Sequence, residues 1–313
     1  MTVAILDIGS NTSKVLVARK DDCGLVTEVA QKSLPCRLAK GLGKGNLILS
    51  EASIETTVKV VSDLLTFSKE FSPYFTKIVA TEALRLLSNA DVFIERIEKE
   101  FGILIDVISG SQEASYIARG LLTDPAISSL TEFHAIDLGG GSLEIMRVVN
   151  GTPQDVTSLP LGAVVIAEKF FGNLSLKPLC KDILALQNYI SQMLKDDAFS
   201  ITQKCDHLVG TGGSILFIRR LISSFKDIEF FSNSNLSFSD IEKITKQVNS
   251  LSLSERTVQF DKLPRDRADV FPAALIVVME LMKFFKLENL THSFHNLRFG
   301  LADELLTDLD PSH

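Results

Sequence analysis

Two short segments with the same residue types could bind phosphate. Residues 7–13 read DIGSNTS and residues 137–144 read DLGGGSLE, and each follows an apolar run that is typical of a β-strand. A glycine-rich turn exposes backbone N–H groups with no Cβ in the way, and such donors can surround a phosphate. The aspartate before each turn, Asp7 or Asp137, can hold a divalent cation beside that phosphate, or simply hydrogen-bond to the turn.

A third glycine-rich segment, residues 209–214 with the sequence VGTGGS, is expected to open a helix, and helix N-termini favour anions. Any one of these turns could be purely structural. Three of them in this order favour a site in which two similar halves of the chain clamp one polyphosphate. The candidate phosphate ligands are Gly9, Ser10, Asn11, Thr12, Gly139, Gly140, Gly141, Ser142, Thr211, Gly212, Gly213 and Ser214.

The residues around these turns predict two halves with similar architecture. The first half begins with a strand–turn–strand, followed by a third antiparallel strand at 24–35. A helix capped by Ser50 is expected over 51–71 and a second helix over 91–101. A strand at 104–109 and a helix from 110 complete this half. The second half restarts with a strand–turn–strand at 133–151. Helices follow at the end of 155–170, over 178–197 and after the third turn, and the remainder reads as mostly helical. Segment 230–239 is loop-like and precedes a helix capped by Ser239 or Asp240.

Composition narrows the class of protein. A chain of 313 residues is long enough for two domains, and a net charge of −7 argues against a large nucleic-acid interface. The four cysteines form no C-x-x-C pair, which suits a reducing cytosol. The N-terminus does not resemble a signal peptide, and the apolar run at 271–285 is too short to span a bilayer and reads as a buried helix. We therefore expect a cytoplasmic protein that binds neither nucleic acid nor a membrane.

The three turns together resemble the actin, sugar kinase and Hsp70 superfamily. Further motifs follow in order over almost the whole chain: VATEALR ending at Arg85, ISGSQEA at 108–114, SLPLGAV at 158–164 and RADV at 267–270. With the three turns, they make the sequence similar to the exopolyphosphatase and guanosine pentaphosphate phosphatase (Ppx/GppA) family.

The resemblance implies an α/β fold of two actin-like (ribonuclease H-like) domains, with mixed sheets and flanking helices around a central cleft. The expected domains are residues 1–124 and 125–313, with the C-terminal helix able to pack back on the first domain. The length fits the short family form without further C-terminal helical domains, and the resemblance suggests a homodimer. The implied activity is release of terminal phosphate from inorganic polyphosphate, or of the 5′ γ-phosphate from guanosine pentaphosphate.

The resemblance also assigns roles within the site. Glu113, in the Ser-Gly-x-x-Glu-Ala motif, is the candidate base that activates water, and Arg85 would neutralise phosphate. Asp137 and Glu144, with Asp7 as a helper, are assigned to magnesium or another divalent cation. The remaining basic residues are Lys14, just beyond the first turn, and Arg267, which is expected to meet the far end of a long substrate. On the alternative interpretation, Glu113 only complements its helix dipole and the basic residues are ordinary surface charges.

Several positions depart from the family pattern. Leu143 replaces a hydroxyl residue in the second turn, and Gln112 replaces an acid that often precedes the catalytic glutamate. The Val-His-Gly segment expected around 230–240 is not recognisable, and SFHNLRFGLADEL stands where SDxGLREGLL is usual. Substrate choice is therefore the least certain implication, while the hydrolytic residues are intact.

Two other functions stay open. A kinase of the same superfamily would transfer phosphate from ATP to a small metabolite, and a binding protein would sense polyphosphate or a guanosine alarmone with little turnover. His292 and His295 have H-x-x-H spacing, but no further ligand candidate stands near them in sequence, so packing roles are expected. Cysteines placed to hold an iron–sulfur cluster are not apparent.

Overall fold

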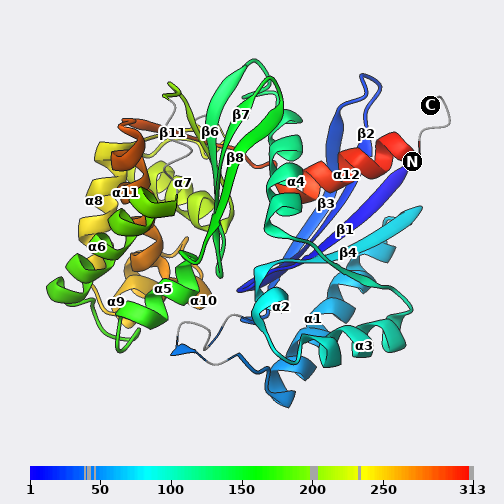
Figure 1. Ribbon diagram of the computed structural model, residues 1–313, viewed down its shortest axis with the longest axis horizontal. Helices are drawn as coiled ribbons and strands as arrows, with labels where there is room; N and C mark the ends of the chain where they lie inside the picture. Colours follow the sequence, from blue (N-terminus) through cyan, green and yellow to red (C-terminus); the bar gives the residue numbers. More distant parts are fainter. Residues whose placement is uncertain (39, 41–43, 46, 198–203, 232–233, 310–313) are drawn as a thin grey trace. The chain divides into compact units, whose positions relative to one another are not determined.

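The computed structural model describes residues 1–309 except 39, 41–43, 46, 198–203 and 232–233. The chain forms two compact units (Figure 1). Unit 1 comprises Met1–Lys40, Gly45–Ser129 and His295–His313, and unit 2 is built on Leu130–Phe294.

Unit 1 contains a five-stranded mixed sheet of order β3-β2-β1-β4-β5. Its strands are β1 (Thr2–Ile8), β2 (Thr12–Lys20), β3 (Val26–Pro35), β4 (Phe75–Ala80) and β5 (Ile105–Val107). The first three strands pair antiparallel, whereas β4 runs parallel to both β1 and β5. Successive apolar residues of β1 are fully buried on both faces, as expected for a central strand covered on each side by other elements.

The helices of unit 1 begin at well-formed N-caps where the sequence offers serine. They are α1 (Glu51–Lys69), α2 (Glu82–Leu86), α3 (Ala90–Phe101), α4 (Gly110–Leu122) and α12 (Leu297–Asp308). Ser50 accepts a hydrogen bond from Ser53 N, which confirms the predicted cap of α1. Ser109 and Gln112 form a capping box at the start of α4, the helix that carries Glu113.

Helices α4 and α12 cross at two glycines, and Figure 1 shows them side by side in unit 1. A Cβ on Gly300 would overlap the carbonyl of Tyr116, and one on Gly120 would overlap the carbonyl of Asn296. Polar contacts reinforce the crossing: Arg119 Nε lies 2.7 Å from Asp303 Oδ2, and Tyr116 donates to Glu304 Oε2 at 2.9 Å. The C-terminal helix therefore fixes the position of α4 by direct backbone contact.

Unit 2 contains a six-stranded mixed sheet of order β10-β11-β9-β6-β7-β8. Its strands are β6 (Glu132–Leu138), β7 (Leu143–Val149), β8 (Thr152–Leu159), β9 (Leu208–Thr211), β10 (Asn235–Ser237) and β11 (Asn289–His292). Strands β6 and β7 repeat the register of β1 and β2: Asp137 pairs with Glu144 as Asp7 pairs with Lys14. The internal repeat that the sequence indicated is thus a repeated β-hairpin.

The helices of unit 2 are α5 (Ala163–Phe170), α6 (Cys180–Asp197), α7 (Gly213–Lys226), α8 (Phe238–Asn249), α9 (Leu253–Gln259), α10 (Arg265–Ala268) and α11 (Phe271–Phe285). Helix α11 is almost entirely buried, which confirms the interpretation of its apolar run. The predicted cap of α8 is wrong: Ser237 caps the helix, and Asp240 N donates to its hydroxyl at 3.2 Å. Strands β10 and β11 were also not predicted.

The expected α/β protein with two mixed sheets and flanking helices is confirmed. Across the part of the chain that the structure describes, no helix combines the length and the apolar character needed to cross a membrane.

Candidate functional site

The first glycine turn, between β1 and β2, has its carbonyl groups bound from the protein side. Cys36 N and Arg37 N both donate to Asn11 O at 3.0 Å, and the Cys36 thiol lies 3.1 Å from Gly9 O. Gly9 is required here because a Cβ would come within 2.8 Å of Thr12 O. An anion at this turn would therefore meet N–H groups rather than carbonyls, as a phosphate cradle needs.

Asp7 stands at the end of β1, directly opposite Lys14. Its Oδ1 atom is buried and has no hydrogen-bond partner in the described structure. Burial raises the pKa of Asp7, against the opposing effect of the positive charges of Lys14 and Arg298. Arg298, on α12, is 5% exposed. It lies in the segment that departs from the family's C-terminal pattern, and sequence reasoning did not assign it to the site.

Glu113 and Arg85 come together although 28 positions separate them. Glu113 lies in the first turn of α4 and is 7% exposed, and its Oε2 is 3.0 Å from Arg85 Nη1. The same Nη1 donates to Ile108 O at 2.6 Å, just before the capping box. An ion pair of this kind holds the carboxylate in one orientation. The two residues assigned to catalysis are thus direct neighbours.

The second glycine turn, between β6 and β7, repeats the carbonyl arrangement of the first. The amides of Gly162, Ala163 and Val164 donate to the carbonyls of Gly141, Gly139 and Gly140 at 3.1, 3.0 and 2.9 Å. A Cβ on Gly162 would overlap the backbone of Gly141, so only glycine, the residue that the SLPLGAV motif has here, lets the two backbones come this close. The start of α5 therefore holds the turn in place, and the carbonyl groups of the turn point towards this helix.

Asp137 and Glu144 lie directly opposite each other on neighbouring antiparallel strands. Directly opposed residues project from the same face of a sheet, and two like charges there repel. Glu144 is 2% exposed, and its Oε1 accepts a hydrogen bond from Ser158 at 2.8 Å. A divalent cation bound by the partly exposed Asp137 carboxylate and the buried Glu144 carboxylate would reduce this repulsion.

The third turn brings Asp137 and Arg267 to the start of α7. Gly212 has a φ of +95°, and a Cβ on it would overlap Asp137 Oδ1. A Cβ on Gly213 would come within 2.6 Å of Arg267 Nη1, so the guanidinium lies against this turn. Arg267 was expected to meet the far end of a long substrate. The structure places it beside the turn itself.

Each unit therefore assembles its own set of the candidate residues. In unit 1 the structure pairs Glu113 with Arg85 and Asp7 with Lys14. In unit 2 it brings Asp137, Glu144 and Arg267 around the second and third turns. The hydroxyl- and amide-bearing residues of the turns are buried: Ser10, Asn11, Thr12, Ser142, Thr211 and Ser214.

The H-x-x-H residues have separate packing roles. His292 is buried in unit 2, where its Nδ1 is 3.1 Å from Arg219 Nη1. Burial, with the nearby charge of Arg219, lowers its pKa to about 3. His295 belongs to unit 1, stacks on Phe299 and lies 2.6 Å from Thr123 Oγ1.

The carboxylates of the candidate site suit magnesium, which keeps water and substrate among its ligands, better than a metal whose ligands all come from the protein. Within the described ranges, no group of three histidine, cysteine, aspartate or glutamate residues converges on one point. Mg²⁺ commonly uses one or two carboxylates together with water and substrate phosphates. In unit 2 the opposed Asp137–Glu144 pair suits that mode of binding. In unit 1 the Asp7 Oδ1 atom, which has no hydrogen-bond partner among the described residues, is a separate candidate ligand.

The chain is similar to known proteins in sequence and in fold. A model described as the Ppx/GppA phosphatase family matches residues 16–309. A Vibrio parahaemolyticus protein named guanosine-5'-triphosphate,3'-diphosphate pyrophosphatase is 28% identical over 98% of this chain and 59% of its own length. The chain thus spans about three fifths of the length of the curated relatives it matches.

Solved structures extend the likeness over the whole fold. The Aquifex aeolicus PPX-GPPA enzyme is 26% identical, covers 97% of this chain and 99% of its own, and superposes with a TM-score of 0.79. An exopolyphosphatase from Cytophaga hutchinsonii superposes with a TM-score of 0.88 over 99% of both chains, at 21% identity, and shows likeness of fold.

Proposed function

The chain belongs to the Ppx/GppA phosphatase family, and from that premise we propose that it hydrolyses phosphoanhydrides. The proposed reaction releases terminal phosphate from inorganic polyphosphate, or the 5′ γ-phosphate from guanosine pentaphosphate. The match over residues 16–309 supports it, as do relatives that are named guanosine-5'-triphosphate,3'-diphosphate pyrophosphatase and PPX-GPPA enzyme.

The observation that carries this proposal is the ion pair between Arg85 Nη1 and Glu113 Oε2, 3.0 Å apart. Hydrolysis of a phosphoanhydride has a loose transition state, so catalysis depends on positioning and charge. A buried, oriented carboxylate can accept the proton of an attacking water, and the adjacent guanidinium can neutralise the phosphate that the water attacks. We assign these two roles to Glu113 and Arg85.

Phosphate binding is assigned to the backbone of the three glycine turns, with Lys14 and Arg267 as charged partners. Carbonyl groups of these turns are already hydrogen-bonded within the protein, which favours N–H groups as ligands of the anion. Asp137 and Glu144 would hold a magnesium ion in unit 2, and Asp7 is the candidate metal ligand of unit 1. When bound, the ion would neutralise phosphate charge. The directly opposed carboxylates of Asp137 on β6 and Glu144 on β7, of which Glu144 is buried, support this assignment.

We also propose that the protein acts in the cytoplasm as a homodimer. The scattered cysteines support a reducing compartment, and the dimer rests on the family resemblance. Sedimentation at micromolar concentration tests the dimer directly.

The activity is tested by phosphate release from long polyphosphate and from guanosine pentaphosphate, side by side, with and without magnesium. The expected result is free phosphate from at least one substrate, with no acceptor added, and its loss when EDTA removes the metal. Phosphate release that needs an added acceptor would indicate a kinase. Tight binding with no release from either substrate would indicate a sensor and contradict the proposal.

A further inference from the structure

A chain of alternating arginine and phenylalanine side chains begins at the third glycine turn of unit 2. The Arg267 guanidinium, which lies against Gly213, is 5.4 Å from the centre of the Phe217 ring. Arg220 stands 5.4 Å from Phe217 and 5.5 Å from Phe230. We call these four residues, Arg267, Phe217, Arg220 and Phe230, the arginine–phenylalanine ladder.

The ladder follows one stripe of helix α7. Gly213, Phe217 and Arg220 are spaced i, i+4 and i+7, which places them on the same face of the helix. Seven residues advance an α-helix by about 10 Å. The stripe therefore leads from the phosphate-binding turn along the helix to Phe230 over a distance that a nucleoside polyphosphate can span.

The far end of the ladder presents aromatic surface to solvent. Phe231 is 72% exposed, and its ring is 5.0 Å from that of Phe230. Phe294 stands 5.7 Å from both rings. Arg220 is also exposed, so aromatic and guanidinium planes are both available here. These are the groups on which a nucleobase stacks.

A buried arginine holds the two phenylalanines in place. Arg219 is 2% exposed, and it donates to Phe230 O at 3.0 Å and to Phe231 O at 3.2 Å. It also contacts Phe294 at 4.7 Å and His292 Nδ1 at 3.1 Å. His292 contacts this cation as a neutral ring, because its pKa is lowered to about 3. The stacking surface is thus anchored before any ligand arrives.

We propose that Phe230 and Phe231, at the end of the ladder, form a nucleobase platform that determines specificity for a guanosine polyphosphate over linear polyphosphate. The phosphates would lie at the Gly212–Gly213 turn with Arg267, and the purine would stack on the exposed aromatic end. This inference rests on the proposed function and names the substrate class of that site. A linear polyphosphate has no ring to stack, so it gains nothing from these two side chains.

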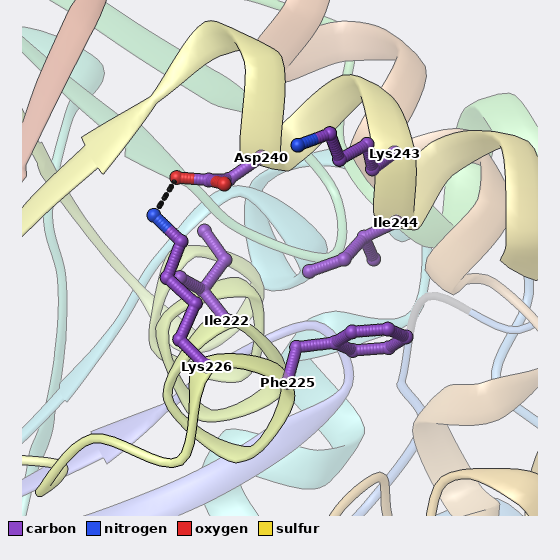
Figure 2. A pocket seen from close by; sticks show the side chains of 6 residues that line it. All are labelled: Ile222, Phe225, Lys226, Asp240, Lys243 and Ile244. Carbon is purple, nitrogen blue, oxygen red and sulfur yellow. Dashed lines mark hydrogen bonds and ion pairs between the residues drawn. The ribbon is translucent and has the colours of Figure 1, made fainter.

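The test replaces each aromatic ring by an aliphatic side chain, in Phe230→Leu and Phe231→Leu. The matched control is Phe225→Leu. Phe225 is also an exposed phenylalanine of α7, but Figure 2 shows it beside Ile222 and Ile244, in a cavity of about 180 Å³ between α7 and α8. The probes are guanosine tetraphosphate binding by calorimetry, and KM and kcat for guanosine pentaphosphate and for tripolyphosphate.

Loss of base stacking is expected to raise Kd for guanosine tetraphosphate, and KM for guanosine pentaphosphate, roughly ten- to hundred-fold. The values of kcat, the KM for tripolyphosphate and all values for Phe225→Leu should stay within about two-fold of wild type. Equal losses with both substrates, or unchanged nucleotide binding in both variants, would overturn the platform. Platform-dependent nucleotide binding with no phosphate release from either substrate would uphold it and refute the proposed hydrolysis instead.

Discussion

Arg85 Nη1 lies 3.0 Å from Glu113 Oε2 and 2.6 Å from Ile108 O, so one guanidinium nitrogen joins α2, the end of the β5 segment and the start of α4. Both of these contacts use Nη1, and a guanidinium carries five N–H donors. The arginine can therefore orient the glutamate and still present other donors to a phosphate. This geometry makes the two residues one functional unit and predicts that their substitutions will not be additive.

Replacing Glu113 by Gln should abolish most turnover and leave the fold intact. The amide keeps the shape of the side chain and can still accept from Arg85, but it cannot take a proton from water. We expect kcat to fall about 10²–10⁴-fold, the usual contribution of a positioned base. Steady-state phosphate release measures this, and Glu98→Gln on α3 is a control for the same change elsewhere. A kcat within a few-fold of wild type would remove Glu113 from the role of base.

Arg85→Ala should lower turnover with every substrate, whatever its length, and also reduce stability. The change removes a charged partner of the largely buried Glu113 carboxylate, which costs roughly 1–3 kcal/mol. Arg85→Lys should recover part of the activity because it keeps the charge and loses the planar fork. A cycle with Glu113→Gln should give a double variant little worse than the poorer single variant. Strict additivity of the two losses would contradict a shared unit.

Asp137→Asn should raise the magnesium concentration needed for half-maximal rate by at least about ten-fold. The amide is similar in size, so it fits beside Gly212, but it removes one of the two negative charges that attract the cation. Magnesium titration of phosphate release provides the measurement. Asp206→Asn, an exposed aspartate of the same unit, is the control. An unchanged magnesium dependence would show that Asp137 is not a ligand.

Much of this arrangement could be predicted from sequence because it is local. An apolar strand, an aspartate and a glycine turn specify a hairpin wherever they occur, and both hairpins formed as expected with identical register. The caps of α1 and the burial of α11 likewise depend on residues close together in sequence. The α8 cap failed for the same local reason, since Ser237, Ser239 and Asp240 are all good caps and only backbone geometry chooses among them.

Contacts between distant segments could not be predicted. Nothing near Gly120 or Gly300 in sequence indicates that each packs against the backbone of the other helix. Arg298 likewise reads as a surface charge until the fold brings α12 against β1 and β2. The position of Arg267 against Gly213 depends on how α10 and α7 pack, and the motif alone does not encode it.

His292→Asn should make the free energy of unfolding less dependent on pH in the acidic range. The folded pKa of His292 is about 3, lowered by burial and by Arg219, against about 6.5 in the unfolded chain. Between these values the unfolded chain binds a proton that the folded chain does not, so the free energy of unfolding falls as pH falls from about 6.5 towards 3. This contribution has a slope of at most about 1.4 kcal/mol per pH unit, and the asparagine variant lacks it.

Urea unfolding at several pH values between 7.5 and 4.5 measures the difference, because the other titrating groups are common to both proteins. The Asn Oδ1 can still accept from Arg219, which limits the loss of packing. His207→Asn, at an exposed position, should leave the slope unchanged. Parallel stability curves for wild type and His292→Asn would contradict a neutral, buried His292.

Gly300→Ala should test whether the packing of α12 against α4 positions Glu113 for catalysis. Alanine normally favours a helix over glycine by about 1 kcal/mol, yet here its Cβ would overlap the Tyr116 carbonyl, so α12 and α4 must move apart. We expect a net destabilisation of roughly 1–3 kcal/mol, which is typical of overpacking. Glu113 lies one turn before Tyr116 on α4, so kcat should fall while KM changes little. Gly172→Ala, where a Cβ meets nothing within 4 Å, is the matched control. The melting temperature and the steady-state kinetics of both variants are measured. A destabilised Gly300→Ala protein with unchanged kcat would mean that α12 supports the fold but does not position Glu113.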